Sequence, residues 1–327
     1  MPVLARISLV LVLVLVTLSS YLRLEHSGIG CDPWPACYGN IGIENTMPDI
    51  GITYERLLEE ARQPLSWATP LHRLVASVLA LLILSMTLYA YLRKNERVIT
   101  TALLALTVFL AWLGIYSEGL RSPAVVMGNL IGGFTMLGLL GWMVFRKIGD
   151  NPHPDKNLRA WILLAIATLS VQIFLGGLTS ANFAASACQT LPHCHGSYFP
   201  GSAITTAFDL TRTHDIGPTG MVLGGAERAD IHKLHRLVAV LTLIAVIGAG
   251  TQAWKRGMVL RVWGYVTITL VITEFLVGLS AILSGLPIAV AVAHNWLAAL
   301  LLLALLKLLA ETSAQSGDFM EARHPPR

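Results

Sequence analysis

The sequence predicts an all-α integral membrane protein of eight transmembrane helices, built as two tandem four-helix bundles related by a pseudo-twofold axis along the membrane normal. Composition is the first reason: of 327 residues, 54% are hydrophobic and 13% are charged, about half the charged fraction of a soluble domain. The second reason is that the apolar residues gather into eight long runs. The third is that two segments of the first half recur in the second.

Each predicted span is a run of about 20 mostly apolar residues, the length needed to cross the hydrocarbon core of a bilayer. The runs cover residues 5–22, 67–91, 98–117, 124–145, 160–180, 231–253, 262–282 and 286–310. The first run has an alternative interpretation as a cleaved signal peptide, because Arg6 precedes a Leu/Val stretch. It lacks a small-x-small cleavage site, and we therefore expect a retained helix.

Charged residues in the connectors predict the orientation of the spans. Basic residues gather in three short connectors, as Arg93, Lys94 and Arg97, then Arg146, Lys147, Lys156 and Arg159, and finally Lys255, Arg256 and Arg261. Because positive connectors stay in the cytoplasm, both termini are expected there, in a bacterial-type inner (cytoplasmic) membrane. The two long loops, about 23–66 and 181–230, then lie on the periplasmic or extracellular side. Clusters this short do not make a nucleic-acid surface, so we expect no nucleic-acid partner.

An internal repeat predicts the two halves. Residues 71–76 (LHRLVA) are identical to residues 234–239, and the pattern C-x3-P-x-C-x-G occurs at 31–39 and again at 188–196. Parallel repeats of this kind are related by an axis along the membrane normal. We therefore expect an N-terminal four-helix half over residues 1–150 and a C-terminal half over 151–327. Bundles of this type build cofactor sites from side chains on facing helices.

The four cysteines of the chain lie in the two long loops, each pair separated by five residues. In an oxidising compartment this arrangement favours two local disulfides, Cys31–Cys37 and Cys188–Cys194. Two alternatives remain open at this point. One is a redox-active disulfide in an exposed loop, and the other is a metal site, with copper at His193 and His195 as the best candidate. Zinc fits less well, because its cysteine ligands usually lie closer together in sequence.

Three of the ten histidines lie inside predicted spans: His72, His235 and His294. Polar side chains within the hydrocarbon are costly and usually functional, although a single one can serve only to hydrogen-bond a neighbouring helix. His235 and His294 fall on the second and fourth spans of the C-terminal half, and we expect them to meet across the bundle. Two neutral imidazoles on opposite sides of an iron make a low-spin heme site.

Two arginines adjoin these histidines in sequence, Arg73 after His72 and Arg236 after His235. Each is a candidate partner for a heme propionate. The alternative, which we weigh equally, is a side chain that snorkels to the membrane surface.

The N-terminal half departs from this pattern in its fourth span. The position of His294 is taken there, to within one residue, by Asn129, which is a poor iron ligand. Met127 carries a thioether, but it lies two residues away and therefore about 200° around the helix. That half has one expected iron ligand, His72. A five-coordinate iron, a weakly held heme and an empty site all stay open there.

These segments resemble the heme A synthases of cytochrome oxidase assembly. The matching text is residues 23–31 (RLEHSGIGC) with 37–39 (CYG), the two Leu-His-Arg segments, LGGLT at 175–179 ahead of the second cysteine pair, and residues 275–287 leading to His294. The resemblance covers nearly the whole chain. Its doubled arrangement of a cysteine loop and a histidine-bearing helix is specific.

The resemblance implies an oxidoreductase that converts the C8 methyl group of heme O into the formyl group of heme A by successive hydroxylations. It implies heme b between His235 and His294 in the C-terminal half. It also implies that two histidines hold the substrate heme in the N-terminal half, with an essential glutamate three residues before the first of them.

The substrate site of this chain departs from that family pattern at two of three positions. His72 matches the first substrate-site histidine, but Asn129 stands at the second and Thr69 at the glutamate. Because Thr69 cannot accept a proton at neutral pH, a weakened activity is expected. Glu118, at the outer end of the third span, is the nearest substitute carboxylate, although an ordinary solvated loop residue is the simpler interpretation.

The sequence therefore predicts a heme A synthase-like enzyme. Its expected partners are heme O and heme A, membrane lipid, a heme O synthase, cytochrome oxidase subunits, and a quinol or another electron donor. Two alternatives from other classes stay open: a non-catalytic heme-binding factor for cytochrome oxidase assembly, favoured by Thr69 and Asn129, and a heme b electron-transfer protein.

Overall fold

The computed structural model describes residues 1–24, 67–116, 123–146, 156–188, 190–212 and 225–312. Its long helices are α1 (Pro2–Leu24), α3 (Ala68–Arg93), α4 (Arg97–Tyr116), α5 (Pro123–Phe145), α6 (Lys156–Ala181), α8 (Ala226–Trp254), α9 (Met258–Leu283) and α10 (Ile288–Thr312). Eight helices of this described part are long and apolar enough to cross a membrane. The predicted all-α membrane fold with eight spans is confirmed.

Some helices extend beyond the predicted spans. α8 begins at Ala226, five residues before its apolar run, and α6 begins at Lys156, four residues before its own. The extra turn of α8 is charged, and protein groups satisfy its charges: Glu227 lies 3.5 Å from Arg212, and Nε of Arg228 donates to the carbonyl of Phe183 at 3.1 Å. Apolarity marks the part of a helix inside the hydrocarbon, whereas hydrogen bonding sets where the helix ends.

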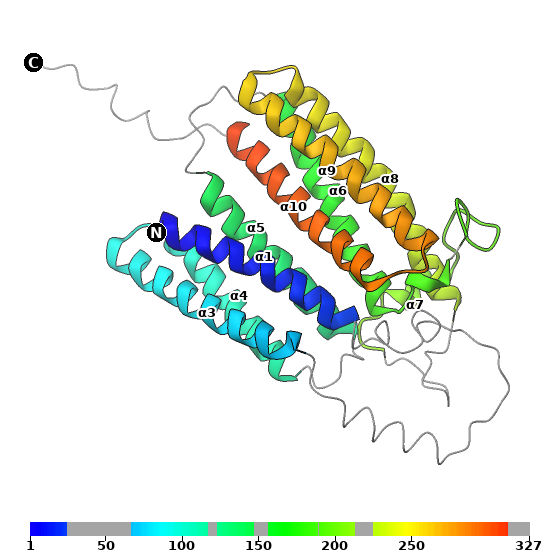
Figure 1. Cartoon of the computed structure of the whole chain (residues 1–327), viewed down its shortest axis with the longest axis horizontal. Helices are drawn as coiled ribbons and strands as arrows, with labels where there is room; N and C mark the ends of the chain where they lie inside the picture. The colour runs from blue at the N-terminus through cyan, green and yellow to red at the C-terminus, as the bar shows by residue number, and fades with distance from the viewer. Residues whose placement is uncertain (25–66, 117–122, 147–155, 189, 213–224, 313–327) are drawn as a thin grey trace, which may run out of the picture.

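The long helices form two groups (Figure 1), with α1, α3, α4 and α5 in one and α6, α8, α9 and α10 in the other. In the first group α1 packs on α3, α3 on α4, α4 on α5, and α5 on α1. In the second group α6 packs on α8, α8 on α9, α9 on α10, and α10 on α6. Both groups therefore show the same order of neighbours. The two-bundle arrangement, the division into residues 1–150 and 151–327, and the pseudo-twofold relation stay predictions.

Helix α10 joins the two groups, because it contacts α1 and α5 as well as α6. One continuous core of buried residues runs through this junction and includes Leu137, Leu140, Leu301 and Leu305. Gly141 lets α5 and α10 approach closely, since an added Cβ there would lie 2.7 Å from a methyl carbon of Leu303. Small residues of this kind are typical of helix contacts in membranes.

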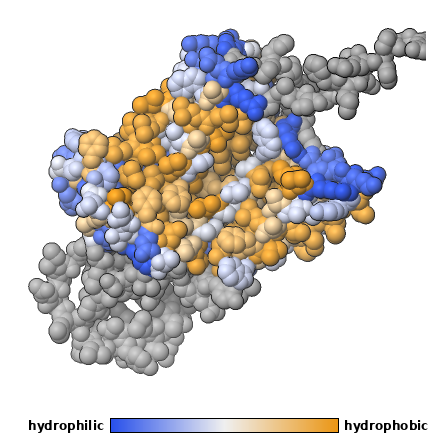
Figure 2. Space-filling model, turned by 180° about the vertical axis from the view of Figure 1, so that it is seen from behind, coloured by the Kyte–Doolittle hydropathy of each residue, from blue (hydrophilic) through white to orange (hydrophobic). Residues whose placement is uncertain are grey.

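On the face seen in Figure 2, the surface of the helices is largely apolar between hydrophilic ends. Large hydrophobic side chains point outward along it: Leu81 is 65% exposed and Ile244 is 59% exposed. In water such a surface would be an aggregation hazard. Facing lipid chains, it is the surface that the composition predicts.

A tight turn between α9 and α10 sets how these two helices align beside the C-terminal site. Gly285 (φ +75°) and Leu286 (φ +62°) take left-handed conformations, and the N–H of Leu286 donates to the carbonyl of Ala281 at 2.7 Å. Pro287 precedes α10, where its missing N–H costs no helical hydrogen bond. The turn folds the end of α9 against the start of α10.

Candidate cofactor site between helices α8 and α10

The site is formed by two histidines that face each other from the second and fourth long helices of the C-terminal half. His235 lies in the third turn of α8, and His294 lies in the second turn of α10. The centroids of their imidazole rings are 6.5 Å apart, and the rings are nearly perpendicular, at 84°. The structure thus brings together the two side chains that the sequence pairs. Their role as iron ligands stays a prediction.

A glycine of a neighbouring helix lies against each imidazole ring. An added Cβ at Gly176 of α6 would lie 3.2 Å from Cε1 of His235, and one at Gly278 of α9 would lie 2.9 Å from Cε1 of His294. Contacts this short force a neighbouring group to move. These glycines therefore serve to leave room for the two rings.

The same two helices carry a polar side chain one turn before each glycine. Nε2 of Gln172 lies 3.3 Å from Nε2 of His235. Oε1 of Glu274 lies 3.1 Å from Nδ1 of His294. Residues four apart share a helix face, so one face of α6 and one face of α9 each contact a histidine, although at different ring nitrogens.

Several buried polar atoms of the site have no hydrogen-bonding partner within the described ranges, namely Nδ1 of His235, Oε1 of Gln172, Oε2 of Glu274 and Nδ1 of His294. The last of these lies 3.1 Å from Oε1 of Glu274, at ion-pair distance. Such atoms are uncommon and often mark the place of a ligand or water. The described residues hold no group of three or more His, Cys, Asp or Glu side chains for a bare metal ion. A heme needs only two from the protein, because the porphyrin supplies four nitrogens. The donor set therefore fits a heme with two axial histidines.

Sequence reasoning missed Gln172, Gly176, Glu274 and Gly278. One signal was available, since Glu274 is the only acidic residue between positions 262 and 310, and an acidic group within a span is usually functional. The other three carry no charge, and their roles become visible only when the helices are packed together.

The residues predicted for the N-terminal site lie on α3 and α5. Thr69, His72 and Asn129 are half-buried, and Arg73 is exposed. Glu118 lies outside the described residues, and its proposed role stays a prediction.

Met127 is not directed into its own bundle. It is 1% exposed, and its sulfur would lie 2.9 Å from a Cβ added at Gly177 of α6. The thioether therefore packs against the C-terminal half, in agreement with its expected turn away from Asn129.

The contact between α4 and α5 differs from the contact between α9 and α10 in which of the two helices carries the glycine. Added Cβ atoms at Gly128 and Gly132 of α5 would lie 2.7 and 2.6 Å from methyl carbons of Leu113 and Leu110 of α4. In the C-terminal half the glycine is on the first helix of the pair, and the large side chain, His294, is on the second. In the N-terminal half the glycines lie on the second helix, α5, and leucine side chains of the first helix, α4, fill the contact between them.

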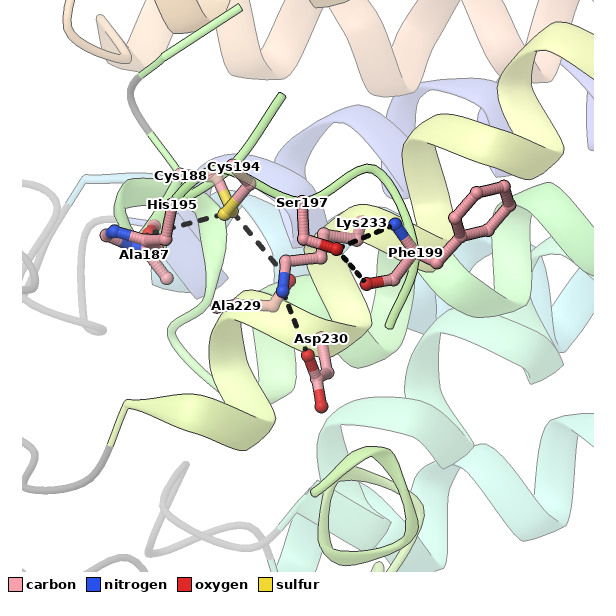
Figure 3. Close-up of polar contacts among 9 residues, drawn as sticks. All are labelled: Ala187, Cys188, Cys194, His195, Ser197, Phe199, Ala229, Asp230 and Lys233. Atoms are coloured by element: carbon pink, nitrogen blue, oxygen red, sulfur yellow. Dashed lines mark hydrogen bonds and ion pairs between the residues drawn. A yellow bond between two sulfur atoms is a disulfide. The ribbon is translucent and has the colours of Figure 1, made fainter. Parts of the chain in front are cut away.

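The loop between α6 and α8 is closed by a disulfide between Cys188 and Cys194, as predicted (Figure 3). This loop contains the 3-10 helix η2 (Ala185–Ala187) and the short helix α7 (Ile204–Ala207). Both cysteines are 1% exposed, and the sulfur of Cys188 lies 3.7 Å from the carbonyl oxygen of Ala229 in α8. Because an attacking thiol needs access to the sulfurs, burial favours a structural disulfide over a redox-active one.

The histidines of this loop have other partners than a metal in the described part of the chain. Nε2 of His195 donates to the carbonyl of Ala187 at 2.9 Å, and the ring of His193 lies edge-on to Tyr198. The copper alternative therefore gains no support. Cys31 and Cys37 lie outside the described residues, and their disulfide stays a prediction.

One face of α8 holds the disulfide loop beside the histidine pair. Nδ1 of His232 lies 3.1 Å from the carbonyl oxygen of Ala184. Arg236 donates to the carbonyl of Thr190 at 2.8 Å and to that of Cys188. The guanidinium is thus fixed by the loop, while its Nε has no partner among the described residues. A heme propionate as a further partner of Arg236 stays a prediction.

Comparison with known proteins identifies the family. The family described as cytochrome oxidase assembly protein matches residues 2–306. A heme A synthase of Shewanella oneidensis is 30% identical over 309 residues, which cover 92% of this chain and 93% of that protein. Heme A synthases of Rhizorhabdus wittichii and Halalkalibacterium halodurans are 26% and 24% identical and cover 91% and 84% of this chain and 89% and 85% of their own lengths.

A different kind of relative matches only in part. A protoheme IX farnesyltransferase of Halobacterium salinarum is 32% identical over 165 residues, which are 49% of this chain and 31% of that protein. The family match, by contrast, includes all of α1 to α9 and both facing histidines. The chain therefore belongs to the cytochrome oxidase assembly protein family.

Proposed function

We propose that the chain is a heme A synthase, which oxidises the C8 methyl group of heme O to the formyl group of heme A and carries heme b between His235 and His294. The observation that carries the proposal is the facing pair of imidazoles, each set against a glycine, in a chain whose full-length relatives are named heme A synthase. When bound, a heme with two axial histidines supplies one-electron transfer.

The protein groups around the pair position the two imidazoles for this task. Gly176 and Gly278 allow each ring to lie against a helix backbone, and Gln172 and Glu274 hold a ring nitrogen of their histidines at 3.3 and 3.1 Å. Ligands whose rings are fixed in advance lose less freedom on binding. The pair is therefore organised before a heme arrives.

The substrate heme is assigned to the N-terminal half, where His72 is the one matching iron ligand. Conversion of the methyl group into the formyl group requires proton transfers, and a positioned base assists such steps. Thr69 cannot act as that base at neutral pH, which leaves Glu118 as the candidate. Arg73 beside His72 is assigned to a propionate.

A second candidate function is a non-catalytic heme-binding assembly factor. The observation that favours it is the packing of α4 on α5, where Leu110 and Leu113 fill the contact over Gly128 and Gly132. Thr69 and Asn129 replace two further functional groups of the family. The N-terminal site therefore offers fewer iron ligands than the C-terminal site.

The positive-inside rule assigns the orientation and the compartment. Both termini and the three basic connectors are placed in the cytoplasm of a bacterial-type cell, and the disulfide loop is placed outside the inner membrane. A heme O synthase is proposed as a partner because heme O must be made before it can be oxidised here. Cytochrome oxidase subunits and a quinol donor complete the proposed partners.

Pigment analysis tests the proposal. The chain is expressed in cells that make heme O and lack their own heme A synthase, and extracted hemes are separated by chromatography. We expect heme A in amounts below those produced by the Shewanella oneidensis relative expressed at the same level. Heme O alone, with bound heme b in the purified protein, would select the assembly-factor candidate instead.

Adding a single methyl group at Gly278 is expected to weaken the heme site. In Gly278→Ala the new Cβ would meet Cε1 of His294 at 2.9 Å, so the ring must shift. Overpacking of this kind costs about 1–3 kcal/mol, which corresponds to about 5- to 150-fold weaker heme binding. Titration of apoprotein with heme measures the effect. The matched control is Gly114→Ala on α4, where an added Cβ meets no described atom within 4 Å; equal losses in both variants would contradict the role given to Gly278.

A further inference from the structure

We propose that Glu274 is a positioning residue for His294, and that it makes the two axial ligands of the C-terminal site chemically unequal. The inference rests on the heme site proposed above and concerns how the protein tunes the bound iron. Its starting point is a carboxylate inside a membrane span, a group that is costly there and usually functional.

The carboxylate and its helix contact the His294 ring at two points. Oε1 of Glu274 lies 3.1 Å from Nδ1 of His294, and the glutamate side chain is only 13% exposed. One turn later, the backbone at Gly278 lies against Cε1 of the same ring. A carboxylate that accepts the Nδ1 proton keeps the lone pair on Nε2, so that this nitrogen faces the metal.

The other histidine has a neutral partner, which contacts its opposite ring nitrogen, Nε2, and leaves Nδ1 of His235 without a partner among the described residues. Nε2 of Gln172 lies 3.3 Å from Nε2 of His235, and Gln172 precedes Gly176 by the same four residues that separate Glu274 from Gly278. An amide polarises an imidazole less than a carboxylate does. A carboxylate partner raises the basicity of the metal-bound imidazole, and a more basic axial ligand favours ferric iron. His294 is therefore the stronger donor, and Glu274 lowers the reduction potential of the bound heme.

A purely structural role for Glu274 makes different predictions. Its Oε2 has no hydrogen-bonding partner within the described ranges, whereas a carboxylate that only joins helices would be expected to satisfy both oxygens. Replacement of a structural carboxylate would lower the thermal stability of the protein and leave the electronic properties of the bound iron unchanged.

Two isosteric exchanges test the inference in the purified holoprotein. Glu274→Gln keeps the size of the side chain and removes its charge, and Gln172→Glu places a carboxylate beside His235 instead. We expect Glu274→Gln to raise the midpoint potential of the heme and Gln172→Glu to lower it, in redox titrations followed by visible absorbance. The low-spin electron paramagnetic resonance signal should shift in both variants. Glu274→Asp should return the potential toward that of the parent protein.

A third variant tests the fixed ring directly. Glu274→Leu removes both the charge and the hydrogen-bond acceptor, and we expect it to weaken heme retention by about 10- to 100-fold, the usual cost of losing such a supporting group. Retention equal to that of the parent protein would count against positioning by Glu274.

The outcomes separate this inference from the proposed function. If both isosteric variants keep full heme and show the midpoint and resonance signal of the parent protein, the positioning role is wrong while the heme site stands. If His294→Ala keeps the low-spin spectrum of the parent protein, the heme site itself is wrong. Should Glu274→Gln fail to fold, Gln172→Glu decides alone: a lowered midpoint supports the inference, and an unchanged one overturns it.

Discussion

Replacing His235 or His294 by alanine is expected to abolish the low-spin heme spectrum of the purified protein, while His72→Ala leaves that spectrum intact. The reason is the geometry of the C-terminal half, where the two imidazoles face each other with centroids 6.5 Å apart. Removal of either one takes away an axial ligand, so iron that remains bound changes its spin state. His72 lies on α3, in the other group of helices, and is no part of that pair.

Visible absorption and electron paramagnetic resonance of the three variants measure this effect. Thermal unfolding of each apoprotein controls for misfolding, and Leu74→Ala, a 61% exposed position on the same helix, controls for general disturbance of α3. A spectrum that is lost in His72→Ala but retained in both other variants would reverse the assignment of the two halves.

The eight spans could be predicted from the sequence because a helix in lipid must be apolar around most of its surface. Span boundaries were less exact, since the first turn of α8 is charged yet remains helical through the contacts of Glu227 with Arg212 and of Arg228 with Phe183. The pairing of His235 with His294 was also predictable, because each is a polar residue in an apolar run at a similar depth.

The residues that support the histidines could not be predicted in the same way. Gly176 and Gly278 matter through what an added Cβ would meet on another helix, and no local pattern in the sequence encodes that contact. Arg236 was expected to face a propionate or the membrane surface, and the structure adds contacts to the carbonyls of Thr190 and Cys188. Tertiary packing supplies such partners, and the repeat alone does not reveal them.

The N-terminal half offers a place for a second histidine that this chain does not use. Gly114 precedes Gly278 by 164 residues, and Asn129 precedes His294 by 165, so the two pairs correspond closely. An added Cβ at Gly114 meets no described atom within 4 Å. This correspondence in sequence makes position 129 the place to introduce a second histidine.

The double change Thr69→Glu with Asn129→His is therefore expected to raise heme A formation strongly in a host that supplies heme O. A positioned base typically contributes about 10²–10⁴-fold in rate, or about 3–5 kcal/mol of the barrier, and the histidine adds a second hold on the substrate heme. Thr69 lies in the first turn of α3, where a carboxylate is favoured by the helix dipole.

Neither single change should suffice, because holding the heme and accepting the proton serve the same step. Chromatography of extracted hemes measures the gain, and Thr69→Gln with Asn129→His is the matched control, since it has the size of the glutamate without its charge. If the unmodified protein already converts heme O as fast as the Shewanella oneidensis relative, the argument from Thr69 and Asn129 is wrong. The proposed enzyme activity then stands, and Glu118 becomes the first residue to test as the base, by Glu118→Gln in the unmodified chain.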